Sequence, residues 1–230
     1  EIRLSLVGSE MCIRDRNNGK ITVSDIAKGS WGHGVLIKAD DGASTFTFTN
    51  NGEISATGTG ASAIEVQYGD GTEAEINLME GSQIDGVVRV GEGTKVTLNA
   101  QGTHDSFILD SKSAKLTIKV SDGANLTLEN DDVKGNGAEI SNVVIDDGRL
   151  NASIWQDENK FKQVKVNEGG IFNIEKLNSN VTDEDPTNDK LLLAYGADYT
   201  LDGGKLYVAE TEYHGDIKVG VLGDLSLIHI

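Results

Sequence analysis

The sequence predicts an all-β fold and, within that class, a parallel β-helix, or solenoid, of about nine coils. Short stretches of alternating polar and apolar residues recur along the chain, and a turn that contains glycine precedes many of them. The stretches resemble one another, as the repeats of a solenoid do. Only 5% of the residues are aromatic, and such a composition suits a narrow aliphatic interior better than a wide sandwich core.

One phrase recurs with small variations: glycine after Asn, Asp or Glu, followed by alternating residues. Examples are NGEISA at residues 51–56, EGTKVTL at 92–98, DGANLTL at 122–128 and DGGKLYV at 202–208. Alternation is typical of a strand with one buried face, and tight turns favour glycine. Apolar residues two positions apart therefore predict the strand centres: Ile21/Val23, Val35/Ile37, Phe46/Phe48, Ile64/Val66, Ile76/Leu78, Val88/Val90, Val96/Leu98, Leu116/Ile118, Leu126/Leu128, Val143/Ile145, Val164/Val166, Phe172/Ile174, Leu206/Val208 and Ile217/Val219.

The alternative fold is an antiparallel sandwich or barrel, because Asn-Gly and Asp-Gly between strands are also hairpin signals. The similarity of the repeats and the uniform composition of residues 17–224 favour the parallel solenoid. A coil of roughly 22 residues buries too little to be stable alone, and so coils must stack. We expect one β-helical domain over residues 17–224, truncated at both ends.

Both ends of the chain resemble translated sequencing-adapter DNA. LVGSEMCIRD, within residues 1–16, and LSLIHI, residues 225–230, back-translate to one short DNA element in opposite orientations. We therefore interpret residues 1–16 and 225–230 as scars, and residues 17–224 as an internal fragment of a longer protein. The single cysteine, Cys12, falls in the first scar.

The charge balance limits the partners. The chain carries 37 acidic and 20 basic side chains, which gives a net charge of -17 at pH 7. Such a surface repels phosphate backbones and anionic lipid, and so we expect no nucleic-acid partner. No apolar run approaches the roughly 20 residues of a membrane helix, and we expect no membrane insertion within this chain.

Residues 176–190 differ from the repeats. This segment is polar and acidic and holds the only proline, Pro186, which predicts a loop that projects from the solenoid. Residues 104–105 and 156–160 are shorter candidates for projecting loops. The acidic loop offers oxygen ligands for calcium at Asp183, Glu184, Asp185, Asn188 and Asp189. It lacks the glycine and closing glutamate of an EF-hand, and we interpret it as a solvated loop.

Several segments resemble the repeats of bacterial autotransporter passenger domains, which belong to the pectin-lyase-like β-helices. They are TNNGEISATGTGASAIEV at residues 49–66, EGSQIDGVVRVGEGTKVTLNA at 80–100 and VNEGGIFNIEKL at 166–177. The resemblance covers most of residues 17–224. It implies a right-handed β-helix that is displayed on a Gram-negative cell surface, commonly as an adhesin. The membrane barrel that follows such passengers is absent from this sequence.

Two acidic clusters suggest the alternative of a polysaccharide lyase or hydrolase on the same fold, because paired carboxylates can cleave glycosidic bonds. One joins His33 to Asp40 and Asp41, and the other joins Asp146 and Asp147 to Arg149. However, Asn-Thr-Asp and Arg-Ile-Lys, which pectin hydrolases of this fold contain, do not occur. Asp-Asp-Gly is also ordinary turn chemistry. We therefore predict no catalytic, cofactor or metal residues.

The two tryptophans, Trp31 and Trp155, can either stack on sugar rings or cap the apolar interior, and we favour capping. Asn125, Asn151 and Asn180 begin Asn-x-Ser/Thr tripeptides, which recur by chance in a chain rich in Asn and Thr.

The expected function is that of a non-catalytic, secreted and surface-exposed passenger, with adhesion as its role. The partner is then a host or surface glycan or protein of unknown identity, and unpaired strand edges favour end-to-end self-association. A structural stalk that holds another module away from the outer membrane is the third hypothesis.

Overall fold

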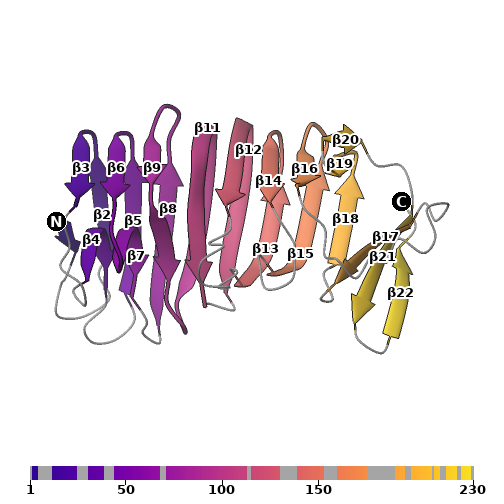
Figure 1. The fold of residues 1–230 in the computed structure, drawn as a ribbon, viewed down its shortest axis with the longest axis horizontal. Helices are drawn as coiled ribbons and strands as arrows, with labels where there is room; N and C mark the ends of the chain where they lie inside the picture. Colours follow the sequence, from indigo (N-terminus) through magenta and orange to yellow (C-terminus); the bar gives the residue numbers. More distant parts are fainter. Residues whose placement is uncertain are drawn as a thin grey trace.

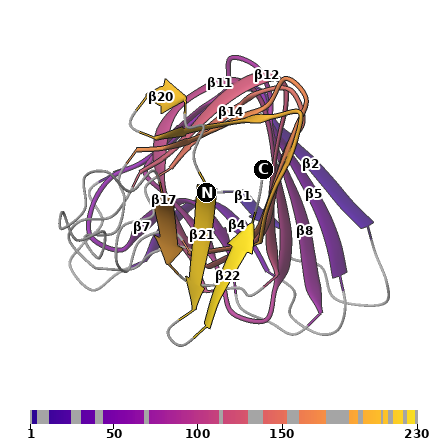
Figure 2. The ribbon, with the colours of Figure 1, turned by 90° about the vertical axis from the view of Figure 1, so that its right-hand side faces the viewer.

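A computed structural model of the chain is all-β (Figure 1). It describes residues 2–4, 12–24, 31–38, 44–67, 71–112, 115–129, 139–152, 160–175, 190–194, 198–208, 210–212, 216–221 and 224–228. Within these ranges every regular element is a strand. Most strands belong to one large, mainly parallel sheet that curls into a half-barrel, as expected for a parallel β-helix (Figure 2).

The first three repeats each contribute three strands. They are β2 (Cys12–Asn17), β3 (Lys20–Val23) and β4 (Gly32–Ile37), then β5 (Ser44–Asn50), β6 (Glu53–Ala56) and β7 (Ala61–Val66), then β8 (Thr72–Leu78), β9 (Gln83–Asp85) and β10 (Val87–Val90). The first strands of successive repeats pair in parallel, and so do the second and the third strands. We call these three stacks the first, second and third wall.

Two long strands continue the walls. In β11 (Lys95–Ser111), residues 95–100 pair with β8 and residues 108–111 pair with β10. β12 (Leu116–Glu129) lies parallel to β11 along most of its length. The first wall continues with β13 (Glu139–Ile145), β15 (Lys160–Asn167) and β18 (Asp198–Asp202), and the second with β14 (Arg149–Ala152), β16 (Ile171–Ile174) and β19 (Lys205–Val208).

The remaining strands lie toward the ends of the chain. β1 (Ile2–Leu4) pairs with β4 in parallel, and β20 (Thr211–Glu212) folds back antiparallel to β19. β17 (Lys190–Ala194), β21 (Asp216–Val221) and β22 (Asp224–Ile228) form a separate sheet in which β21 and β22 are antiparallel. Every other pairing between named strands is parallel, as predicted.

The glycine turns do not form hairpins. β5 and β6 flank the Asn51-Gly52 turn, yet β5 pairs with β2 and β8 while β6 pairs with β3 and β9. The turn at Gly203 likewise joins β18 and β19, which pair with β15 and β16. The turns therefore carry the chain from one wall to the next, and the hairpin alternative is wrong for them.

Successive turns stack closely at the corner between the first and second walls. Asn17 and Asn50 are buried there, and Asn17 Nδ2 donates to Asn50 Oδ1 over 2.8 Å. The backbone N–H groups of Asn51 and Glu53 donate to the carbonyls of Asn17 and Gly19. A Cβ added to Gly52 would lie 2.0 Å from the carbonyl oxygen of Gly19, and so only glycine fits this stack.

β1 and most of β2 and β22 fall in the segments that resemble translated adapter DNA. The pairing of β2 with β5 uses backbone N–H and C=O groups, which every residue except proline supplies. The pairing is therefore indifferent to the origin of the side chains, and the adapter interpretation stays a prediction.

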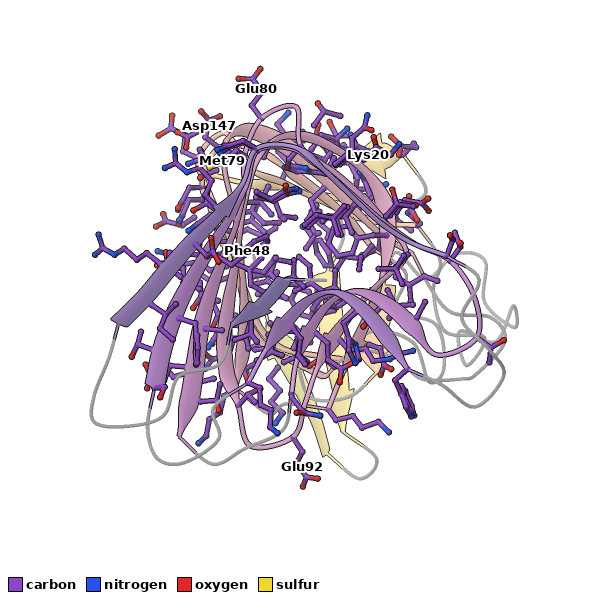
Figure 3. All side chains as sticks on the ribbon, turned by 90° about the vertical axis from the view of Figure 1, so that its left-hand side faces the viewer. Lys20, Phe48, Met79, Glu80, Glu92 and Asp147 are labelled. Carbon is purple, nitrogen blue, oxygen red and sulfur yellow. The ribbon has the colours of Figure 1, made fainter. Side chains whose placement is uncertain are left out.

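The interior of the curled sheet is filled by the alternate side chains of the strands (Figure 3). Phe46, Phe48, Phe107 and Phe172 are its largest fully buried side chains, and aliphatic residues make up most of the rest. Glu80 and Glu92 project outward from turns at opposite edges of the curl. The alternation that predicted the strands thus separates core from surface.

Three rings from neighbouring strands pack together at the end of this core. Phe172 on β16 meets Phe161 on β15 edge-to-face, with ring centroids 5.5 Å apart. Tyr199 on β18 stacks on Phe172 with centroids 6.2 Å apart. Burial raises the pKa of the Tyr199 phenol far above its ordinary range, because the phenolate would lose its hydration.

We expect the protein to lose stability in alkali through Tyr199. In the unfolded chain the phenol ionises near its ordinary pKa of about 10, whereas in the folded chain it stays protonated. The stabilisation is complete below the unfolded pKa, and it is lost as pH rises from there toward the higher pKa of the folded chain. Urea denaturation from about pH 8 to 11 should show a falling midpoint, and Tyr199→Phe should weaken that slope. An unchanged slope in Tyr199→Phe would contradict this, and Tyr207→Phe is the control.

The described residues test one of the three predicted projecting loops. His104 and Asp105 lie within β11, and His104 is buried with Nε2 2.8 Å from the carbonyl oxygen of Gln101. The projecting loop predicted at residues 104–105 is therefore wrong. The predicted loops at 176–190 and 156–160 lie outside the described residues, except that Lys190 begins β17 and Lys160 begins β15.

Candidate functional site

A groove of about 720 Å³ lies over the first wall, across β12, β13, β15 and β18. Polar residues on these strands line it in two rows set by the strand register. The first row is Thr117, Asn142, Gln163 and Asp198, and the second joins the apolar Val144 to Lys165 and Thr200. Gln163, Lys165, Asp198 and Thr200 are exposed. Amide, hydroxyl and charged groups are thus arranged side by side on paired strands, where they can bind a polar ligand.

The predicted acidic pair lies at the turn between β13 and β14. Asp146 and Asp147 are both exposed, and the Asp146 carboxylate accepts a hydrogen bond from the side-chain amide of Asn167. Arg149 begins β14, where its Nε donates to Asn151 Oδ1 over 2.7 Å. The guanidinium also pairs with Glu210 and lies 5.5 Å from the centre of the Tyr207 ring. Arg149 therefore binds along the second wall rather than to the acidic pair.

A ladder of hydrogen-bonded asparagine side chains runs across the second wall, from β12 through β14 to β16. Asn151 Nδ2 donates to Asn125 Oδ1 over 2.9 Å, and Asn173 Nδ2 reaches Asn151 Oδ1 over 3.2 Å and Glu210 Oε1 over 2.9 Å. Asn173 is fully buried. Because the amide of Asn151 is used in this ladder, a glycan attached there would break it. Asn125 lies at the other end of the same ladder, and Asn180 lies outside the described residues.

The ladder ends beside Lys205 and Glu212. Lys205 Nζ donates to Glu212 Oε2 over 3.0 Å, and the Tyr207 hydroxyl donates to the same oxygen over 3.3 Å. The hydrogen bond with Glu212 and its negative charge raise the pKa of Lys205. These contacts join β19 to β20, where the strand folds back.

His33 is held on the third wall by two oxygen atoms. Its Nδ1 lies 2.8 Å from Ser62 Oγ and 3.1 Å from Glu65 Oε2. A Ser-His-acid triad needs the serine and the carboxylate on opposite ring nitrogens, so that the imidazole can carry a proton between them. Here both oxygens contact Nδ1, and so the imidazole cannot carry a proton from the serine with support from the carboxylate on the opposite nitrogen.

Arg89 on β10 lies next to this group. Its Nε donates to Asp110 Oδ2 over 3.4 Å, and its Nη1 lies 3.9 Å from Glu65 Oε2. Strand pairing places Glu65, Arg89 and Asp110 in one row across β7, β10 and β11. The Arg89 guanidinium also lies 5.6 Å from the centre of the Trp31 ring.

Trp31 does not cap the interior, and that prediction is wrong: the residue is 70% exposed. The alternation that buries Val35 and Ile37 would also turn residues 31 and 33 inward, but it slips by one at Gly34. Gly34 and Val35 are both buried, and Gly34 faces the Ala63 carbonyl and the Ile54 side chain. The slip turns His33 and Trp31 outward.

Several predicted candidates lie outside the described residues. They are Asp40, Asp41, Trp155 and the acidic oxygens considered for calcium at Asp183, Glu184, Asp185, Asn188 and Asp189. In the described part of the chain, no group of three or more His, Cys, Asp or Glu side chains is placed to hold a metal ion. Over the same ranges, no helix has the length and apolar character needed to cross a membrane.

Comparison with known proteins gives no relative: no family model, no curated protein and no solved structure matches this chain.

Proposed function

We propose that this chain is part of a non-catalytic passenger of the autotransporter type, a right-handed parallel β-helix of about nine coils that is displayed on a Gram-negative cell surface and acts as an adhesin. The observation that carries the proposal is the polar groove on the first wall. Thr117, Asn142, Gln163 and Asp198 come from four adjacent parallel strands and occupy one register row. Such a row presents regularly spaced hydrogen-bonding groups to a ligand without any nucleophile or relay.

The partner is a host or surface glycan or protein that contacts this groove. The net charge of -17 argues against polyanionic partners, because they would be repelled along the whole chain. The resemblance of residues 49–66, 80–100 and 166–177 to passenger repeats supports extracellular display, with the outer-membrane anchor in another part of the protein. Among the described strands, β2 and β18 each pair on one side only, and such edges favour end-to-end self-association of this chain.

Binding of the purified chain to panels of mucin, matrix proteins and cells tests the proposal. We expect saturable binding to at least one surface, and at least tenfold weaker binding for the triple variant Asn142→Ala, Gln163→Ala, Asp198→Ala. The matched control is Lys95→Ala, an exposed side chain on the same wall that pairs with Glu73. Uniformly absent binding would reject adhesion and favour the stalk.

A further inference from the structure

We propose that the groove on the first wall binds a short acidic glycan, whose negative groups pair with lysines on the strands of the groove. The inference rests on the proposed adhesive function and names the ligand class of the same groove. Four exposed lysines lie on two of the strands that form it, β12 and β15, or directly before them. They are Lys115, Lys119, Lys162 and Lys165, and we call them the lysine cluster.

The lysine cluster reverses the charge of the chain locally. The whole chain carries a net charge of -17, yet residues 115–121, 140–145 and 161–167 hold four lysines and no acidic residue. These segments run through β12, β13 and β15 on the first wall, and the three strands are adjacent and parallel (Figure 1). At the start of β13, Glu139 is in register with Lys160 of β15, and so this pair adds no net charge. The area is therefore positive.

Acidic residues lie at the edges of this area. Asp198 and Asp202 are on β18, the last strand of the first wall, while Asp122 and Asp146 follow the first-wall segments of β12 and β13. Lys165 Nζ lies 3.9 Å from Asp202 Oδ2. An anion is thus attracted to the part of the groove over β12, β13 and β15 and is repelled beyond it. The surrounding charge still opposes long polyanions, and so the ligand is short.

The strand register places two members of the lysine cluster on either side of one small residue. Lys119, Val144 and Lys165 occupy one row across β12, β13 and β15. Adjacent strands are about 4.8 Å apart, and so the two lysine side chains begin about 10 Å apart on one face. Among the described residues, Lys119 forms no ion pair with a carboxylate. Because Val144 is shorter than either lysine, both ammonium groups can reach one carboxylate or sulfate above it.

The neighbouring row supplies hydrogen bonds to the rest of the ligand. Thr117, Asn142 and Gln163 line the groove in register, and each of these side chains can donate as well as accept. Sugar hydroxyls also donate and accept, and so a glycan can satisfy the whole row.

An acidic peptide fits the groove less well than a glycan. Val144 is the one apolar side chain among the groove residues that is not buried, and so the groove offers little to apolar anchors of a peptide. β12, β13 and β15 each pair with a strand on both sides. Their backbone groups are therefore used, and a peptide cannot add to them as a further strand.

Calorimetric titration with three tetrasaccharides tests the inference. Chitotetraose is neutral, a hyaluronan tetrasaccharide carries carboxylates, and a chondroitin sulfate tetrasaccharide carries carboxylates and sulfates, which separates the two anions. At low salt, at least one acidic tetrasaccharide should bind about tenfold more tightly than chitotetraose. The double variant Lys119→Ala, Lys165→Ala should weaken that binding by about tenfold. Lys119→Arg, Lys165→Arg should keep most of it, because the charges remain. Lys20→Ala, an exposed lysine on the second wall, is the matched control.

Asp198→Asn should have the opposite effect. It removes a negative charge from the groove and keeps a side chain of the same shape that forms hydrogen bonds. We expect about twofold tighter binding of the acidic tetrasaccharide and unchanged binding of chitotetraose.

Three results would overturn the acidic-glycan inference. The first is that neither acidic tetrasaccharide binds more tightly than chitotetraose, and the second is that the alanine double variant binds as tightly as the wild type. The third is that a short glutamate peptide of equal charge binds as tightly as the acidic tetrasaccharide. Binding to mucin, matrix or cells that persists beside any of these results would leave the proposed function standing, whereas absence of binding to every surface and every sugar would reject both.

Discussion

Gly52→Ala is expected to destabilise the protein by about 3 kcal/mol or more, because the added methyl group meets backbone. The new Cβ would lie 2.0 Å from the Gly19 carbonyl oxygen and 2.9 Å from the nitrogen and carbonyl carbon of the same residue. None of these atoms belongs to a flexible side chain, and so the two turns must separate. Separation would stretch the hydrogen bond from the Glu53 N–H to the Gly19 carbonyl and the buried contact between Asn17 and Asn50. Urea denaturation followed by circular dichroism measures the loss.

Gly19→Ala is the matched control, because Gly19 occupies the same position in the preceding turn. No atom lies within 4 Å of a Cβ added there, and its φ is not in the left-handed region. We expect Gly19→Ala to be neutral or to stabilise by about 0.5 kcal/mol, since alanine restricts the unfolded chain. Equal effects of the two substitutions would contradict the close stacking of the turns.

The strands could be predicted from the sequence because the signal for each one is local. Every apolar pair predicted as a strand centre lies inside a strand, from Ile21 and Val23 in β3 to Ile217 and Val219 in β21. Parallel pairing was also predicted, because similar repeats can stack only by placing equivalent strands side by side. Most of the turns were predicted in place, but the turn predicted at Asp122-Gly123 lies within β12, and glycine serves two purposes at these positions. Gly123 and Gly203 adopt positive φ, whereas Gly52 leaves room for a neighbouring carbonyl.

The slip at Gly34 was not predicted, because simple alternation assigns Trp31 and His33 to the face of Val35. The structure turns them outward, since Gly34 fits where only a residue without a side chain can approach the Ala63 carbonyl. The missed signal was the Gly-His-Gly sequence at 32–34, because glycine within a strand often marks an irregularity. His104 was missed for a related reason: a polar residue suggested a loop, whereas inside β11 its ring is buried, with Nε2 2.8 Å from the carbonyl oxygen of Gln101.

The row of Glu65, Arg89 and Asp110 could not be predicted from the sequence. Its members lie on three different strands, and the register that brings them together depends on coil lengths that vary along the chain. Of the residues selected in advance, only His33 and Trp31 belong to this group. Asp146, Asp147 and Arg149 are close in sequence, but the structure directs Arg149 to Glu210 and Asp146 to Asn167.

Phe172→Ala is expected to cost about 3–5 kcal/mol, the range for removing a fully buried phenylalanine. Phe172 is completely buried and contacts both Phe161 and Tyr199, and so it links β15, β16 and β18. Because each repeat is stabilised mainly by its neighbours, we expect the loss to fall on β13–β19 rather than on β2–β10. Amide hydrogen exchange should show faster opening in residues 139–208 and little change in residues 44–90.

Two further variants separate the ring contacts from general damage to this end of the stack. Phe172→Leu keeps most of the volume and should cost less than about 1.5 kcal/mol. Lys162→Ala changes an exposed side chain beside Phe161 and should stay within about 0.5 kcal/mol of the wild type. If Phe172→Ala instead accelerated exchange equally along the whole chain, the repeats would unfold as one cooperative unit. The stack would then be coupled over its full length, and the nearest-neighbour description of this fold would be wrong.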